Sequence, residues 1–237
     1  MSSPLGIKHL LPFMEGINKR IDQTMLKYDR GLKDYEAFVE ASDKYSFRAL
    51  VVPSSMVDYI SSIAKTPVAG VAGFPYGYFP LRVKEQEIRH IASAGGKEVD
   101  FVINIVNVKS RDFGAVEEEV NTLVKSAKEV GLGVKVIVET SALTDEELAR
   151  VSEIVASSGA DFLKTNSGYG SRGATLRDIY IMKSVVGDSI KIKAAGGIRN
   201  ALDAATFLYA GADVIGASSG IKIVEEAYDY LKRFREK

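Results

Sequence analysis

Short β-type runs alternate with longer helical segments along this chain, and the unit repeats eight times. The helical segments carry apolar residues at three- and four-residue spacing, as at Val116, Val120 and Leu123. Repeated βα units predict a parallel sheet, and eight of them in 237 residues favour a closed (β/α)₈ TIM barrel over an open doubly wound sheet. The predicted strands are 21–26, 47–53, 68–74, 98–104, 134–139, 162–165, 190–194 and 214–217.

No linker rich in proline, glycine or serine divides the chain, and no charge block or short repeat does so. We therefore expect a single TIM-barrel domain over residues 1–237, with an extra N-terminal helix before Ile21. The run from Thr144 to Glu147 resembles a capping box, which predicts a helix start, and Gly131 and Gly159 stand where helices are expected to end.

Charge and composition argue against several classes of protein. The 31 basic and 31 acidic side chains cancel, unlike those of a general nucleic-acid or anionic-membrane binder. The chain has no cysteine, which excludes disulfides, thiolate metal sites and cysteine nucleophiles. No stretch approaches the roughly 18 apolar residues of a membrane span, and the first residues lack the apolar run of a signal peptide. We expect a cytoplasmic protein without nucleic-acid or membrane partners.

Charged residues stand within the apolar runs of four predicted strands. Side-chain alternation places Asp100, Lys135, Lys164 and Lys193 inside the barrel if each strand turns that face inward. Burying an ammonium group costs several kcal/mol unless it is paired or loses its proton, so this pattern predicts a nucleophilic amine. The alternatives are that the lysines are exposed at strand ends, and that Asp100 is only a structural partner of a lysine.

Other charged and aromatic residues have less decisive patterns. Lys191 begins its strand, so we expect it to reach solvent at the barrel floor. Glu139 is open between a structural ion pair and a site role. The aromatic group of Tyr76, Tyr78 and Phe79 is open between a packed loop, a subunit contact and a substrate wall. The two histidines, at positions 9 and 90, are too few and too far apart for a metal site.

Glycine-rich turns accompany the last three predicted strands, at 168–170, 196–199 and 216–220. Glycine lets backbone amides approach an anion, and the loops after strands seven and eight of this fold commonly bind phosphate. The turns therefore predict a phosphorylated small-molecule ligand. Each turn alone also has a geometric explanation, because βα loops often need glycine.

Together, in this order, the motifs resemble the class I deoxyribose-phosphate aldolase family between about Ile21 and Ile223. The resemblance implies a (β/α)₈ fold, no metal or organic cofactor, and a homodimer or homotetramer. It also implies reversible cleavage of 2-deoxy-D-ribose 5-phosphate to acetaldehyde and D-glyceraldehyde 3-phosphate. The segments that carry it are 21–27, 73–77, 98–100, 135–140, 162–165, 193–199 and 216–219.

Residue by residue, the resemblance makes Lys164 the Schiff-base lysine, Lys193 its electrostatic partner and Asp100 the proton-transfer carboxylate. A lysine with a pKa of about 10.4 is less than about 0.1% neutral near pH 7, so a nearby cation and desolvation must lower its pKa. Lys135 would extend this charge network and position Asp100. Substrate hydroxyls would meet Asp22, Thr24 and Ser167, and phosphate would meet Gly168, Gly196, Gly197, Gly216, Ser218 and Ser219.

The chain departs from the family pattern at three places, one of which is Val51 or Val52 where the family often has a cysteine on the second strand. Gln23 stands where the family often has histidine, and Asn166 lies in a segment that is usually richer in hydroxyl groups. None of these departures removes a catalytic group, but they leave the substrate preference and the hydroxyl contacts open.

Two other functions remain as alternatives. A Schiff-base aldolase for a different phosphorylated aldehyde or ketose would share Lys164 and the phosphate loops. A non-catalytic phosphosugar-binding barrel would use the lysines only as cations and would form no covalent adduct. That second alternative explains the glycines but not a buried Asp100.

Overall fold

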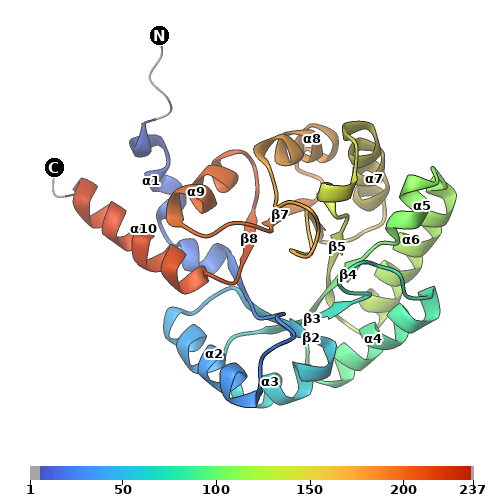
Figure 1. Cartoon of the computed structure of the whole chain (residues 1–237), viewed down its shortest axis with the longest axis horizontal. Helices are drawn as coiled ribbons and strands as arrows, with labels where there is room; N and C mark the ends of the chain where they lie inside the picture. Colours follow the sequence, from blue (N-terminus) through green and yellow to red (C-terminus); the bar gives the residue numbers. More distant parts are fainter. Residues whose placement is uncertain (1–5, 236–237) are drawn as a thin grey trace, which may run out of the picture.

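Eight strands form a barrel at the centre of the molecule, inside a ring of helices (Figure 1). A computed structural model describes residues 6–235. Every neighbouring pair of strands is parallel, and β8 pairs with β1 to close the barrel. The predicted (β/α)₈ TIM barrel is thus confirmed. The strands are β1 (Ile21–Thr24), β2 (Ala49–Pro53), β3 (Val68–Ala72), β4 (Glu98–Val102), β5 (Gly133–Ile137), β6 (Phe162–Lys164), β7 (Lys191–Ala195) and β8 (Val214–Ala217).

Several strands end earlier than the sequence predicts. Gly73 and Glu139 have φ values of 61° and 54°, which turn the chain out of the extended conformation one residue after the end of β3 and two residues after the end of β5. Apolar residues continue past these points because the loops also pack on the barrel, as Leu26 and Phe74 do against Val51 and its neighbours. Hydrophobic runs therefore overestimate strand length at the mouth of the barrel.

Helices cover the outside of the barrel through their apolar faces. In α6, for example, Val116, Val120 and Leu123 are fully buried at the predicted spacing. Thr144 forms the predicted capping box with Glu147 at the start of α7. The helices are α2 (Leu32–Tyr45), α3 (Val57–Ile63), α4 (Leu81–Ser93), α5 (Ile105–Lys109), α6 (Phe113–Glu129), α7 (Asp145–Ser157), α8 (Leu176–Val186), α9 (Ala201–Tyr209) and α10 (Gly220–Arg235), with short 3₁₀ turns η3 (Ser54–Met56) and η4 (Thr140–Ala142).

The extra N-terminal helix is present as three short turns, η1 (Ile7–His9), α1 (Leu11–Met14) and η2 (Ile17–Arg20). Gly16 separates the last two with a φ of 61°. The segment packs against α9 and α10 (Figure 1). The ring of Phe13 meets that of Tyr209 edge-on. Arg20 then donates to the carbonyl groups of residues 212 and 213 at the start of β8. Within residues 6–235, no helix has the length and apolar character needed to cross a membrane.

The inside of the barrel is divided into an apolar side and a charged side. Val51, Ala69 and Val71 on β2 and β3 form the apolar side. The inward residues of β1 and β4–β7 include the charged groups that the alternation predicts, and they are described below. Since parallel barrels place their active sites at the C-terminal ends of the strands, the upper part of this charged side is the candidate site.

Candidate active site

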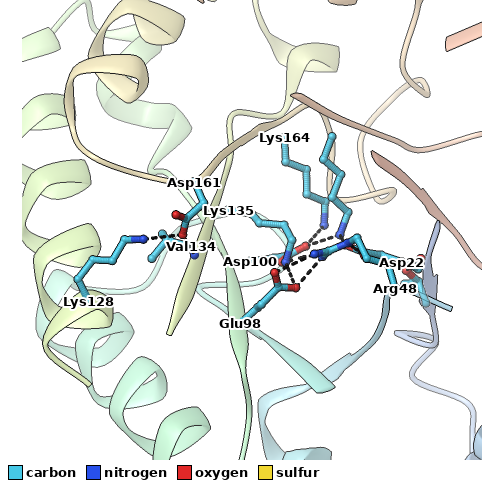
Figure 2. A network of polar contacts seen from close by, with 11 residues as sticks. Asp22, Arg48, Glu98, Asp100, Lys128, Val134, Lys135, Asp161 and Lys164 are labelled. Carbon is cyan, nitrogen blue, oxygen red and sulfur yellow. Dashed lines mark hydrogen bonds and ion pairs between the residues drawn. The ribbon is translucent and has the colours of Figure 1, made fainter. Parts of the chain in front are cut away.

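Asp100 on β4 is the centre of a buried cluster of charges (Figure 2). Its Oδ2 accepts hydrogen bonds from Nζ of Lys164 and Nζ of Lys193, both at 2.8 Å. Its Oδ1 accepts from Nζ of Lys135 at 2.9 Å. Burial alone would raise the pKa of Asp100, but the three ammonium groups hold it well below its usual value. The carboxylate is therefore ionised at neutral pH, and all four side chains predicted to face inward do meet.

Lys164 is the member of this cluster that reaches the pocket. Its side chain is 4% exposed and lines a cavity of about 870 Å³ at the mouth of the barrel, whereas Lys193 and Lys135 are fully buried. Burial lowers the pKa of Lys164 to about 8, and Lys193 and Lys135 add to the decrease against the opposing charge of Asp100. About one tenth of Lys164 is then neutral at pH 7, which makes it a candidate nucleophile.

Asp22 lies inside the barrel, beneath the residues that line the pocket. Its Oδ2 is 2.6 Å from Nζ of Lys193, and both carboxylate oxygens accept hydrogen bonds from Arg48. Burial would raise the pKa of Asp22, but Lys193, Lys135 and Arg48 lower it to about 2. We predicted that Asp22 meets a substrate hydroxyl. The structure places this fully buried carboxylate among cations beneath the residues that line the pocket, and the contact with a substrate hydroxyl stays a prediction.

The predicted phosphate residues line one wall of the pocket: Gly168, Gly196, Gly197, Gly216, Ser218 and Ser219. Gly168, Gly196 and Gly197 have φ values of 93°, 98° and 80°, which favour glycine. Ser218 and Ser219 directly precede α10, whose N-terminus carries partial positive charge. Within residues 6–235, the amides of Gly168, Gly197 and Ser219 donate no hydrogen bond to protein, so they are free to bind an anion.

Gly216 differs from the other glycines because it lies within β8 and not in a loop. A Cβ at this position would stand 2.9 Å from Cε of Lys193. Its missing side chain therefore leaves room for Lys193 to reach Asp100. This steric role was not visible in the sequence, where Gly216 was grouped with the phosphate loop.

The hydroxyl groups of Ser167 and Thr24, both predicted to bind substrate, line the pocket, and each donates its proton to an acceptor within the protein. Ser167 donates through Oγ to Oε2 of Glu139 at 2.6 Å, and its amide donates to the same oxygen at 2.8 Å. Thr24 donates through Oγ1 to the carbonyl group of Asp22. Both hydroxyls thus meet a ligand as hydrogen-bond acceptors. Glu139, left open between an ion pair and a site role, holds the loop after β6 through Ser167, and it also accepts a hydrogen bond from Ser141 in η4.

The remaining residues singled out in the sequence lie away from this cluster. Lys191 is exposed, as predicted, and its Nζ lies 5.6 Å from the ring centroid of Phe162 at the barrel floor. Tyr76, Tyr78 and Phe79 are exposed, and Tyr76 donates to the carbonyl group of residue 169 at 3.5 Å. Both histidines are exposed, and no group of three potential metal ligands occurs in the described part of the chain.

Comparison with known proteins identifies the family. The family model named DeoC/LacD family aldolase matches residues 24–226. The chain belongs to this aldolase family. It is 42% identical over 218 residues to the deoxyribose-phosphate aldolase of Thermococcus kodakarensis, which spans 90% of this chain and 97% of that relative.

Solved structures agree with this membership. The aldolase QR15 superposes with a TM-score of 0.86 at 38% identity, covering 93% of this chain and 98% of the other. The deoxyribose phosphate aldolase from Aeropyrum pernix, described as tetrameric, superposes with a TM-score of 0.85 at 31% identity, covering 96% of this chain and 100% of the other. Both superpose over nearly the whole DeoC/LacD aldolase chain, which supports the membership.

Three residues of this DeoC/LacD aldolase belong to the site or its charge network but were not predicted as site residues from the sequence. Arg48 and Glu98 sit at the starts of their strands and complete the charge network from below. Gln23 lines the pocket and accepts a hydrogen bond from the amide of Gly220 at 2.9 Å, which anchors the N-terminus of α10 beside β1. Glu98 lies two residues before Asp100 on the same strand, so side-chain alternation indicates that it faces inward as well. The contacts of Arg48 and Gln23 depend on how the strands are arranged in the closed barrel.

Proposed function

We propose that this protein is a class I deoxyribose-phosphate aldolase. It would cleave 2-deoxy-D-ribose 5-phosphate reversibly to acetaldehyde and D-glyceraldehyde 3-phosphate. The observation that carries the proposal is Lys164, a nearly buried lysine with a pKa of about 8 at the base of a pocket that has glycine amides and a helix N-terminus on one wall. The relatives named deoxyribose-phosphate aldolase support the choice of substrate.

Lys164 begins the reaction as its neutral amine. It attacks the C1 carbonyl carbon of the open-chain substrate, and loss of water gives an iminium ion. A base removes the proton of the C3 hydroxyl, the C2–C3 bond breaks, and its electrons form an enamine on C1 and C2. D-glyceraldehyde 3-phosphate leaves, the enamine is protonated at C2, and water releases acetaldehyde from Lys164. The iminium is the electron sink, so the reaction needs no metal or organic cofactor.

The surrounding charges have distinct roles in this scheme. Asp100 transfers protons, directly or through water, because its Oδ2 lies 2.8 Å from the reacting nitrogen. Lys193 is the nearby cation that favours the neutral amine of Lys164, and Lys135 orients Asp100 through Oδ1. The phosphate group binds the amides of the glycine loops with the Ser218 and Ser219 hydroxyls, while Thr24 and Ser167 accept from substrate hydroxyls.

Reductive trapping tests the proposal directly. The protein is incubated with deoxyribose 5-phosphate or acetaldehyde, reduced with borohydride, digested and examined by mass spectrometry. We expect the reduced adduct on Lys164, and Lys164→Met should remove it. Phosphosugar binding without an adduct on any lysine would favour the non-catalytic barrel. An adduct without cleavage of deoxyribose 5-phosphate would favour an aldolase for another phosphorylated substrate.

Replacement of Lys193 tests its electrostatic role. Without this cation the Lys164 ammonium is less disfavoured, so the pKa of Lys164 rises and the acid limb of the pH profile moves to higher pH. We expect Lys193→Met to lose about 10- to 100-fold in kcat/KM at pH 7, since one to two pKa units change the neutral fraction by that factor. Activity should partly recover between pH 9 and 10. The measurement is kcat/KM from pH 6 to 10, with Lys191→Met as the control on the same strand and face.

The proposal extends to the organisation of the protein. We propose that residues 1–237 form one aldolase domain and that the protein is a homodimer or homotetramer, for which the tetrameric Aeropyrum pernix relative is the support. The cytoplasmic location and a role in deoxyribonucleotide catabolism stay predictions from the sequence and the family. Light scattering after gel filtration would distinguish a dimer from a tetramer, and a monomer would contradict the proposed assembly.

A further inference from the structure

Arg48 joins two carboxylates at the floor of the barrel (Figure 2). It directly precedes β2, and its side chain is 22% exposed. Towards Asp22, its Nε lies 2.6 Å from Oδ1 and its Nη2 lies 3.0 Å from Oδ2. Towards Glu98, its Nη1 lies 2.9 Å from Oε1 and its Nη2 lies 2.6 Å from Oε2. The guanidinium group therefore makes two-point contacts with two carboxylates at once.

The same two carboxylates also bind the lysines that flank Asp100. Asp22 lies 2.6 Å from Nζ of Lys193, and Glu98 accepts from Nζ of Lys135 at 2.8 Å. Opposite charges therefore alternate from the floor to the pocket along two routes. One route runs through Asp22 and Lys193 and the other through Glu98 and Lys135. Both meet at Asp100, which binds Lys164.

A charge count over this network shows what Arg48 contributes. Three carboxylates, those of Asp22, Glu98 and Asp100, face three cations besides Lys164: Arg48, Lys135 and Lys193. The network is neutral when Lys164 has lost its proton. Without Arg48, the three carboxylates would be balanced only if Lys164 kept its proton.

The other charged or titratable groups around Lys164 lie outside this count. Lys191 is exposed at the floor, and Glu139 is bound by Ser141 and Ser167. The charged groups on the pocket wall are exposed to solvent, which screens them: Lys27, Asp29, Arg30 and Arg199, beside the exposed Tyr28. Tyr169 is half-buried, and its hydroxyl group donates to the carbonyl group of Leu26. The protonation of Lys164 therefore depends mainly on the charges of these three carboxylates and three cations.

We propose that Arg48 is a positioning residue for the aldol reaction: from the barrel floor it satisfies the carboxylates of Asp22 and Glu98, so that the network is neutral without a proton on Lys164. The inference deepens the proposed function and rests on it. Arg48 touches neither substrate nor the reacting nitrogen, and it acts through Lys193 and Lys135. A purely structural Arg48 would tie β1, β2 and β4 together at the floor without changing the protonation of Lys164.

Two charge deletions with opposite consequences separate these roles. Arg48→Met removes a cation, so Lys164 must hold its proton more tightly and its pKa rises. Glu98→Gln removes a carboxylate, so the same pKa falls. The double variant Arg48→Met/Glu98→Gln removes one charge of each sign, which restores the net charge of the network. Arg48→Lys keeps the cation. A purely structural role of Arg48 does not predict that the two single variants shift the pKa of Lys164 in opposite directions.

The pKa of Lys164 is measured without relying on turnover, from the pH dependence of its acetylation by acetic anhydride, read by mass spectrometry. We expect a rise of about one unit in Arg48→Met, which is about a tenfold loss of neutral amine at pH 7, a fall in Glu98→Gln, and little change in the double variant. The acid limb of kcat/KM should move in the same directions. Arg48→Lys should stay close to the wild-type value.

Equal losses of activity at every pH, with the pKa of Lys164 unmoved, would overturn the inference, and so would shifts of the same sign in both single variants. Circular dichroism checks that each variant is folded. If Arg48→Met does not fold, Glu98→Gln and the double variant still test the opposed signs. A wild-type protein without aldolase activity would contradict the proposed function, whereas the acetylation result would still decide the role of Arg48.

Discussion

Lys164→Met is expected to abolish turnover and to stabilise the protein. Without the amine no iminium forms, so kcat should fall by at least about 10⁴-fold, as for the loss of other covalent nucleophiles. Burial lowers the pKa of Lys164 from 10.5 to about 8, which corresponds to a destabilisation of at most about 3 kcal/mol at pH 7. Removing the ammonium group relieves this, and three cations remain to balance three carboxylates. Urea unfolding at pH 7 measures the gain.

The pH dependence of that gain distinguishes it from better packing. The folded protein binds the Lys164 proton less tightly than the unfolded chain, so the destabilisation is fully present below pH 8. It should shrink as the pH rises from about 8 to about 10.5, and the two unfolding curves should converge there. Lys191→Met, at an exposed position, should keep full activity and change stability by less than about 0.5 kcal/mol. A stable Lys164→Met variant that still cleaves substrate would refute the assigned nucleophile.

The barrel and its inward charges were predictable because they follow from local regularities. Alternating βα units specify the fold class, and the two-residue period of strands places Asp100 and Lys164 on inward faces once each strand is found. The lowered pKa of Lys164 was also predictable in direction, because burial and a neighbouring cation both disfavour the charged form of a lysine. The fold class and the inward faces need only the neighbours of each residue along its own strand.

The contacts that were missed join residues far apart in the sequence. Gln23 binds the amide of Gly220 across 197 positions, a contact that exists only because β1 closes against β8. Asp22 has an inward position like that of a residue that binds substrate, but its carboxylate is hydrogen-bonded to Arg48 at the floor of the barrel. No strand pattern reports how deep a side chain lies along the barrel axis. The pairing of charges therefore required the register between strands.

Asp100→Asn is expected to impair both chemistry and folding, because three ammonium groups converge on this one carboxylate. Asparagine keeps the shape but not the charge. The lysines are then left with only Asp22 and Glu98, and removal of one partner from a buried ion pair destabilises by about 3 to 5 kcal/mol. We also expect kcat to fall by about 10³-fold or more, since general acid–base transfer contributes about 10² to 10⁴.

The stability deficit of Asp100→Asn should depend on pH with a defined sign. The pKa of Asp100 is held well below its usual value, so its contribution is fully present above about pH 4 and is lost as the pH falls further. Urea unfolding of both proteins at pH 7 and pH 3 should therefore show a smaller difference at pH 3. Asp161→Asn is the matched control, because Asp161 binds Lys128 at the surface (Figure 2) and its loss should change stability by less than about 1 kcal/mol. An Asp100→Asn variant as stable and active as this control would show that the convergence of lysines on Asp100 contributes to neither folding nor catalysis.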